Sequence, residues 1–325
     1  MHNIAFDGLG GECIQKNCPK ALQKFLTKVT DVRIGVATFK NHYDVILSEV
    51  DKNLHSRLFF LDGPEKIDFS ESPVAALKKK TKSSVSVAVR AVKSGECESL
   101  LSFGHTGAAV ASAQLQLGLI PGVSKAGLAA LMPNRSGCGI LMDVGANLNC
   151  KPIHLFHYGL MADVYARRIL KIAKPKIGLL NVGAEKSKGD VFLRETYECF
   201  EKGELNFVGN VEGGQVFDGT IDVVICNGIT GNMLLKSSES LAQMLINEFR
   251  EKVGIAKSEV MDKLANAYDP DSVGASRLLG VAGLVLIGHG NAGEHAIYSG
   301  LKSVYNEIVM GLQPAIYERL APQEK

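Results

Sequence analysis

The chain has 325 residues, of which 46% are hydrophobic and 22% charged, proportions typical of a folded globular protein. Its formal net charge of +2 does not indicate a concentrated basic face, so we expect no nucleic-acid partner. The seven cysteines are scattered without CxxC spacing, which argues against a disulfide framework or a zinc site and favours a reducing cytosol. There is neither a leader-like N-terminus nor an apolar stretch of ~18 residues, so we expect a cytoplasmic protein.

Short apolar runs alternate with helical patterns along the chain. Most of the runs are continuous rather than alternating, as in parallel strands covered on both faces, and they lie at 3–7, 32–37, 56–61, 100–104, 140–144, 177–182, 221–226 and 284–288. Helical spacing predicts helices over 108–117, 153–174, 191–201, 232–252 and 294–319. This alternation predicts one α/β domain over residues 1–325, with three α/β/α layers, a mainly parallel sheet and ligands at the carboxyl ends of the strands.

The segment 241–268 interrupts the alternation. Its apolar residues recur at helical spacing, and Gly254 divides it, which predicts a protruding helical pair inserted in the domain. One interpretation is that the pair packs on the core or on a second subunit. The other is that its apolar side dips into a membrane surface.

Three loops share one pattern, in which an apolar strand leads into a glycine-bracketed polar loop and then a helix. They lie at 102–107, 181–189 and 227–232. Glycine lets backbone N–H groups approach a ligand, and a helix N-terminus adds donors and a partial positive charge, so such loops favour phosphate. One loop alone could be an ordinary turn, but together they predict an oxyanion site formed by His105, Thr106, Gly107, Asn181, Glu185, Lys188, Asn227, Gly231 and Asn232.

Further turns after strands place polar groups at the same expected sheet edge. Their candidate phosphate-binding residues are Asp7, Gly10, Gly11, Asp143 and Asn147. A GxGxxG string at 288–293 also follows a strand, but neither a second strand nor an acidic residue about 20 positions on follows it, so we reject NAD binding there. We expect His289 in that string to line an anion-facing turn.

Protein nucleophiles and metal sites have no recognisable motif in this sequence. It contains neither a GxSxG elbow nor an HExxH pair, and we expect no cofactor and no metal. A reaction without a protein nucleophile needs one from the substrate, and inorganic phosphate would serve.

These motifs resemble the phosphate acyltransferase (PlsX) family of bacterial phospholipid synthesis. The resemblance runs from Asp7 to the C-terminal helix and includes DGLGG at 7–11, GHTGA at 104–108, DVGAN at 143–147, KG at 188–189, GNVEG at 209–213 and NGITGN at 227–232. It implies a homodimer with an isocitrate/isopropylmalate-dehydrogenase-like fold. It also implies conversion of an acyl-[acyl-carrier-protein] and inorganic phosphate to acyl phosphate and free carrier protein. The product would feed a membrane glycerol-3-phosphate acyltransferase in phosphatidic acid synthesis, which fits a location at the inner face of the cell membrane.

The resemblance implies that Lys188 and Asn232 are catalytic. Lys188 could offset the charge of phosphate and of the tetrahedral intermediate, and the Asn232 amide could donate to the developing oxyanion. Three positions depart from the family pattern: Glu12 replaces Asp, His105 replaces Asn, and Asn227 replaces Asp. The last change removes a carboxylate beside the proposed site.

Other functions remain open on the sequence. A phosphotransacetylase-like enzyme using acyl-CoA would be favoured if Lys78–Lys80 and Lys82 met a nucleotide phosphate, although such a run is also typical of a solvated helix end. A catalytically weak peripheral membrane scaffold could be built around 241–268. A metal- and NAD-dependent dehydrogenase needs clustered acidic ligands and an arginine-rich pocket, and the sequence has neither.

Overall fold

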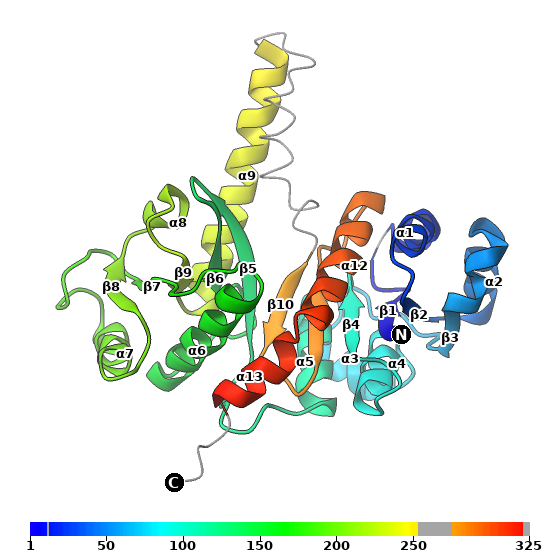
Figure 1. Ribbon diagram of the computed structural model, residues 1–325, viewed down its shortest axis with the longest axis horizontal. Helices are drawn as coiled ribbons and strands as arrows, with labels where there is room; N and C mark the ends of the chain where they lie inside the picture. The colour runs from blue at the N-terminus through cyan, green and yellow to red at the C-terminus, as the bar shows by residue number, and fades with distance from the viewer. Residues whose placement is uncertain (12, 253–274, 321–325) are drawn as a thin grey trace. The chain divides into compact units, whose positions relative to one another are not determined.

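The computed structural model describes residues 1–11, 13–252 and 275–320 (Figure 1). The chain forms two compact units, Met1–Ile120 with Gly274–Gln313 and Pro121–Val273 with Pro314–Lys325. Each unit contains a mainly parallel set of strands with helices on both faces. The predicted three-layer, mainly parallel α/β/α class is confirmed.

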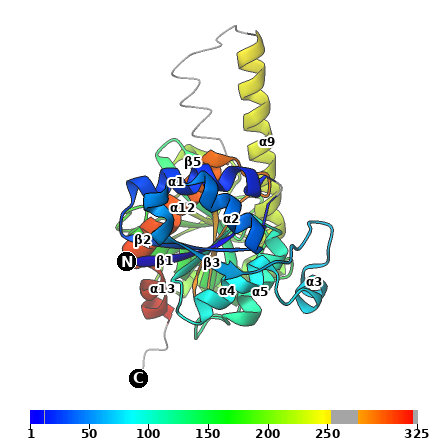
Figure 2. The same cartoon turned by 90° about the vertical axis from the view of Figure 1, so that its right-hand side faces the viewer.

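Six strands build the sheet of the first unit. In sheet order they are β3 (Leu58–Asp62), β2 (Val32–Thr38), β1 (His2–Asp7), β4 (Ser99–Ser102), β11 (Leu284–Ile287) and β10 (Ser276–Leu279). All pairs are parallel except β10 with β11. One face carries α1 (Ile14–Lys28), α2 (Lys40–Glu49) and α12 (Glu294–Val309), and the other α4 (Ser84–Lys93) and α5 (Thr106–Gln116) (Figure 2). The short η1 (Lys52–Arg57) and α3 (Pro73–Lys79) lie in connections.

In the second unit, the described residues form five strands. In sheet order they are β5 (Gly127–Asn134), β6 (Gly137–Met142), β9 (Val223–Ile225), β7 (Ile177–Leu180) and β8 (Phe207–Val211). Only the β5–β6 pair among them is antiparallel. One face carries α6 (Pro152–Arg168) and α7 (Val191–Glu201), and the other α8 (Gln215–Asp218) and α9 (Gly228–Lys252) (Figure 1). The last helix, α13, spans Leu312–Leu320.

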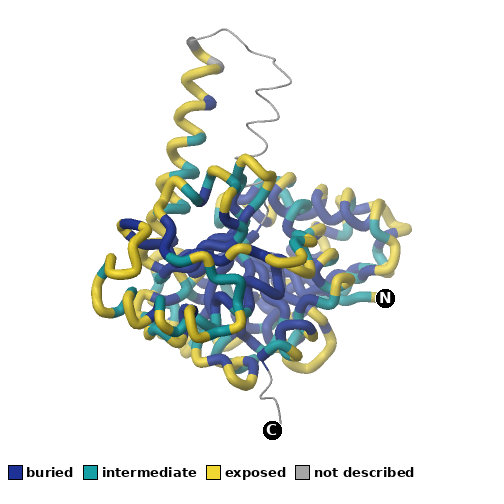
Figure 3. Tube along the Cα trace, turned by 60° about the vertical axis from the view of Figure 1, so that its left-hand side comes forward, coloured by how far each residue is buried: buried dark blue, intermediate teal, exposed yellow. Residues whose placement is uncertain are grey.

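The buried strands explain why the sequence pattern was informative. β4, β7, β9 and β11 are buried at every residue, so each is a continuous apolar or small-residue run (Figure 3). The single helix predicted over 294–319 was wrong, because Gly311 adopts a left-handed conformation with φ of 62° and separates α12 from α13. The helix predicted over 153–174 ends earlier, at Arg168.

The first part of the predicted helical pair belongs to α9, a continuous helix of 25 residues. Residues 253–268, with the dividing Gly254, lie outside the described part of the chain. Toward its end α9 carries exposed apolar side chains, with exposed fractions of 54% for Leu241, 44% for Leu245 and 51% for Phe249. None of the helices in the described ranges has the length and apolar composition that crossing a membrane requires.

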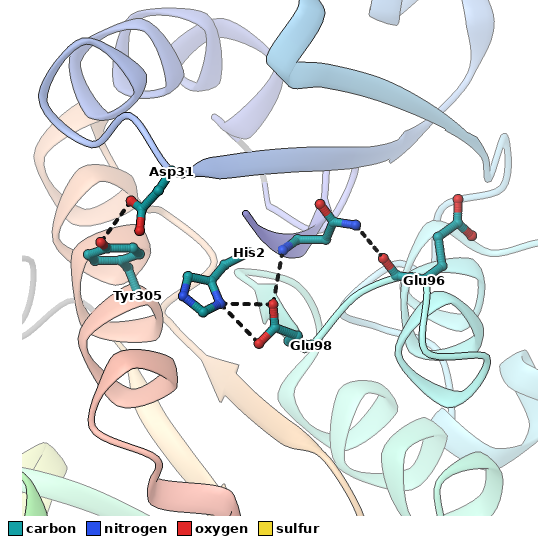
Figure 4. Close-up of polar contacts among 6 residues, drawn as sticks. His2, Asp31, Glu96, Glu98 and Tyr305 are labelled. Carbon is teal, nitrogen blue, oxygen red and sulfur yellow. Dashed lines mark hydrogen bonds and ion pairs between the residues drawn. The ribbon is translucent and has the colours of Figure 1, made fainter.

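A polar cluster anchors the amino-terminal end of β1 (Figure 4). His2 Nδ1 lies 3.0 Å from a carboxylate oxygen of Glu98, and the His2 ring packs edge-on against Tyr305. Tyr305 in turn donates a 2.8 Å hydrogen bond to Asp31, and this bond lowers the pKa of the Asp31 carboxyl group. These contacts join β1 to the residues before β2 and β4 and to α12, and they lie at the strand end opposite to the predicted site.

Candidate functional site

In the first unit, the loops after β1, β4 and β11 come into direct contact. A Cβ atom on Gly10 would lie 2.8 Å from the backbone nitrogen of Gly104, and one on Gly11 would lie 2.7 Å from the carbonyl oxygen of Gly290. Both distances are too short for a real side chain, so glycine at positions 10 and 11 permits the close approach. The structure therefore gathers the candidates Gly10 and Gly11, the His105 loop and the His289 loop at one sheet edge.

Asp7 is the buried centre of this group of loops. Its side chain is 1% exposed, and it accepts hydrogen bonds from Ser102 Oγ at 2.7 Å and from the Leu9 backbone N–H at 3.4 Å. Ser102 Oγ in turn accepts from the Gly104 N–H at 3.1 Å. Burial raises the pKa of the Asp7 carboxyl group, although these hydrogen bonds act in the opposite direction. In this geometry the Asp7 carboxylate joins the first turn to the Gly104 turn.

His105 lies immediately before α5, so Thr106 and Gly107 form the first turn of that helix. Its ring stacks on Phe69, with centroids 6.1 Å apart and planes 18° apart, and its Nε2 lies 3.2 Å from the Glu71 carbonyl oxygen. The imidazole is thus held by the segment before α3. The helix N-terminus beside it retains the character of an anion site.

In the second unit, Asp143 organises the turn after β6. Its Oδ1 accepts N–H hydrogen bonds from Leu128, Gly145 and Ala146, and its Oδ2 accepts from both the backbone N–H and the amide of Asn147. The side chain is fully buried, and burial raises the pKa of the carboxyl group against these hydrogen bonds. Asn147 also donates to Tyr158 and to the Ala126 carbonyl oxygen. In this geometry the polar groups of Asp143 and Asn147 are used to hold the turn.

The start of α9 packs against the Asp143 turn. Asn227 Oδ1 accepts the Thr230 N–H at 2.9 Å, as an N-cap residue does. A Cβ atom on Gly231 would lie 1.9 Å from the carbonyl oxygen of Asp143. One turn into the helix, the exposed Asn232 side chain lies against Gly145, where an added Cβ would be 3.5 Å from Asn232 Oδ1. This packing sets the position of Asn232.

The turn after β7 carries Lys188. Its ammonium nitrogen lies 4.0 Å from Glu185 Oε1, and the side chain is 48% exposed. Gly189 follows with φ of +84°, a conformation that favours glycine, and Asp190 then caps α7 by accepting the Leu193 N–H. The Lys–Gly pair therefore places an exposed cation at a fixed turn before a helix.

The second unit thus brings all eight of its predicted site residues to one sheet edge. β6, β9 and β7 are neighbouring parallel strands, so their carboxyl ends share that edge. The loops that follow them carry Asp143, Asn147, Asn181, Glu185, Lys188 and Asn227, and the first turns of α9 carry Gly231 and Asn232. An exposed ammonium and an exposed amide at such an edge can stabilise an anion and a developing oxyanion. The remaining candidates, Asp7, Gly10, Gly11, His105, Thr106, Gly107 and His289, lie in the first unit.

Comparison with known proteins identifies the family. A family model described as fatty acid synthesis protein matches residues 2–312. The phosphate acyltransferase of Desulforamulus reducens is 39% identical over 330 residues, which cover 98% of each chain. That of Desulfitobacterium hafniense (strain Y51) is 34% identical and covers 93% of this chain and 92% of the relative. The chain belongs to the phosphate acyltransferase family.

Two solved structures define the fold to which this family member belongs. A phosphotransacetylase from Streptococcus pyogenes matches with a TM-score of 0.63 at 15% identity, covering 97% of this chain and 94% of that one. A 4-hydroxythreonine-4-phosphate dehydrogenase from Klebsiella pneumoniae matches with a TM-score of 0.51 at 11% identity, covering 98% and 99%. The predicted dehydrogenase-like fold is therefore confirmed. Membership of the phosphate acyltransferase family separately shows that the chain is an acyltransferase of lipid biosynthesis.

The structure gives physical roles to two of the departures from the phosphate acyltransferase pattern. Asn227 caps α9, a task that asparagine and aspartate perform about equally well. His105 gains the stacking contact with Phe69. Glu12, the third departure, lies outside the described residues.

Two residues to which the sequence gives no role, Phe69 and Asn210, also contact the candidate loops. A Cβ atom on Gly290 would lie 2.3 Å from the Phe69 ring, so this ring covers Gly290 as well as stacking on His105. Asn210 lies in the GNVEG motif, and its amide donates to the Glu185 carbonyl oxygen of the Lys188 turn. The motif was therefore the available signal for Asn210, whereas Phe69 had none.

Proposed function

We propose that this acyltransferase transfers an acyl group from acyl-[acyl-carrier-protein] to inorganic phosphate. A phosphate oxygen attacks the thioester carbonyl carbon, the tetrahedral intermediate collapses, and the carbon–sulfur bond breaks. Acyl phosphate and the carrier thiolate leave, and the thiolate takes up a proton from solvent. The proposal is supported chiefly by the shared edge at which the Lys188 turn and the Asn232 helix follow the neighbouring strands β7 and β9.

The two proposed catalytic side chains suit the charges of this reaction. Lys188 offsets the negative charge of phosphate, and the Asn232 amide donates to the oxyanion formed from the thioester carbonyl. Because phosphate is itself an anionic nucleophile, a strong general base is not required. Holding phosphate against the thioester supplies the proximity contribution. Formation of acyl phosphate is the first step of phosphatidic acid synthesis, and the product passes to a membrane glycerol-3-phosphate acyltransferase.

The decisive assay mixes the purified protein with acyl-[acyl-carrier-protein] and follows free thiol with and without phosphate. We expect thiol release that rises with phosphate and saturates, accompanied by acyl phosphate that hydroxylamine traps as a hydroxamate. Thiol release at the same rate with and without phosphate, or no thiol release at all, would refute the proposed reaction. A parallel reaction with acyl-CoA tests the phosphotransacetylase-like alternative, which predicts a higher kcat/KM with acyl-CoA than with the carrier protein.

The exposed apolar residues near the end of α9 bear on how the enzyme assembles. We propose that a second copy of the chain covers this face in a homodimer, because Leu241, Leu245 and Phe249 are all exposed in a single chain. Contact of the same face with the inner surface of the cell membrane is the competing arrangement.

Charge on this apolar face separates the two arrangements. The double variant Leu245→Glu with Phe249→Glu should sediment as a monomer, and it should bind phosphatidylglycerol vesicles no less than the unmodified protein does. Gln243→Glu with Asn247→Glu adds the same charges at exposed polar positions of α9 and should remain dimeric. If the Leu245→Glu, Phe249→Glu variant loses vesicle binding but stays dimeric, the membrane contact is supported instead.

A further inference from the structure

The turn that carries Lys188 is held from two neighbouring strands. β7 and β8 are paired in parallel, with Leu180 opposite Val211, and each contributes an asparagine near its carboxyl end. Asn181, which follows β7, donates from its amide nitrogen to the Lys188 carbonyl oxygen at 3.2 Å. Asn210, within β8, donates from its amide nitrogen to the Glu185 carbonyl oxygen at 2.8 Å. The two amides therefore hold the turn by hydrogen bonds to two of its carbonyl oxygens, those of Glu185 and Lys188.

Contacts within the turn fix the orientation of the Asn181 amide. Asn181 Oδ1 accepts the Val182 N–H at 2.8 Å, and a Cβ atom on Gly189 would lie 2.8 Å from the same oxygen. The Lys188 N–H closes the turn by donating to the Glu185 carbonyl oxygen at 3.0 Å. That oxygen thus accepts both the closing hydrogen bond and the Asn210 amide, using its two lone pairs.

Asn210 is an unfavourable residue for stability alone. It is 5% exposed, and its Oδ1 has no hydrogen-bond partner among the residues that the structure describes. A buried acceptor without a donor destabilises the folded state, and an apolar side chain of similar size would avoid this loss. A polar side chain here is explained by its donor, which reaches the Lys188 turn.

We propose that Asn210 and Asn181 are positioning residues that set where the Lys188 ammonium group stands. The inference rests on the proposed function, in which Lys188 meets the phosphate. The Lys188 ammonium is half-exposed and lies 4.0 Å from Glu185 Oε1, whereas its stem lies against Gly183 of the same turn, where an added Cβ would be 3.3 Å from Lys188 Cγ. The backbone of the turn therefore sets the path of the side chain toward its ammonium group. Releasing one end of the turn moves the ammonium relative to the bound anion, and small misplacements of reacting groups reduce rates strongly.

Kinetics test the positioning role through a matched pair of asparagines. Asn210→Ala should lower kcat/KM for phosphate by about 10- to 100-fold. Asn206, just before β8, also donates from its amide to a carbonyl oxygen, that of Lys174 at 3.3 Å, outside the Lys188 turn. Asn206→Ala removes that hydrogen bond and should leave kcat/KM unchanged. In a Lys188→Ala background, Asn210→Ala should cause no further loss, because it acts through the lysine. Independent, multiplying losses, or an equal loss in Asn206→Ala, would overturn the proposal.

A second measurement does not depend on turnover. The rate at which an amine-selective acetylating reagent modifies Lys188 can be compared, by peptide mass spectrometry, with the rate at exposed Lys186 in the same turn. We expect Asn210→Ala to change the ratio of these rates about threefold or more, as local opening of the turn increases, and Asn206→Ala to leave it unchanged. An unchanged ratio in Asn210→Ala refutes positioning even if the enzyme is active. A changed ratio in a protein without phosphate-dependent thiol release would instead leave positioning intact and refute the proposed reaction.

Discussion

Replacing Lys188 by alanine should lower kcat for acyl phosphate formation by about 10²- to 10³-fold, the loss usual for one group that stabilises transition-state charge. The reason is that the ammonium is the proposed partner of both the attacking phosphate and the tetrahedral intermediate. Stability should change little, since the side chain is half-exposed and its ammonium lies 4.0 Å from Glu185 at the surface. Thiol release at saturating phosphate and acyl carrier measures the effect.

Lys186 provides the control for this variant. It lies two residues earlier in the same turn and is also exposed, but its ammonium binds Glu201 at 2.7 Å. Lys186→Ala should retain nearly normal kcat. Near-normal rates for Lys188→Ala, or equal losses in both variants, would contradict the assignment of Lys188. Asn232→Ala should behave like Lys188→Ala, because the proposed oxyanion donor is removed.

Gly231→Ala should be among the most destabilising single substitutions in the second unit. The added Cβ would stand 1.9 Å from the Asp143 carbonyl oxygen, which is backbone, and 2.8 Å from Sγ of Cys226, which is buried, so neither neighbour can move aside freely. Relieving this overlap must shift α9 or the Asp143 turn, and overpacking of this kind costs about 3 kcal/mol. Thermal unfolding followed by circular dichroism should show a clearly lowered midpoint, and activity should fall because Asn232 moves with the helix.

Gly213→Ala is the appropriate comparison. A Cβ atom at Gly213 meets no atom within 4 Å, and the φ of Gly213 is not in the left-handed region. The unfolding midpoint of the Gly213→Ala variant should therefore match that of the unmodified protein. Equal midpoints for the two alanine variants would show that the contact between Gly231 and Asp143 is not tight in solution. The prediction also explains why glycine is needed in the NGITGN motif without any contact between Gly231 and phosphate.

The sequence predicted most accurately the strands that are buried along their whole length. Strands such as β7 and β11 are uninterrupted apolar runs, and they were located to within two residues. β5, β8 and β10 were missed. β5 ends in Pro133 and Asn134, and β8 contains Gly209 with a positive φ, so neither resembles a regular strand.

The loops of the candidate site could be predicted from the sequence, but the hydrogen bonds and packing contacts between them could not. Glycine-bracketed turns after strands pointed to Lys188 and Asn232 because local pattern and backbone geometry are linked. The role of Asn210 depends on a contact across 25 positions, and that of Phe69 on contacts with loops after two other strands. Such contacts follow from the order of strands in the sheet, which no local pattern encodes.

The continuity of α9 has a mechanical consequence. Asn232 stands in its first turns, and Leu245 and Phe249 near its far end, within one uninterrupted helix of 25 residues, about 37 Å long. A regular helix is stiff over this length, so a tilt imposed on its distal half is carried to the Asn232 amide instead of being absorbed between them. A subunit or a lipid surface that covers the distal apolar side chains and tilts the helix would therefore also displace the proposed oxyanion donor, Asn232.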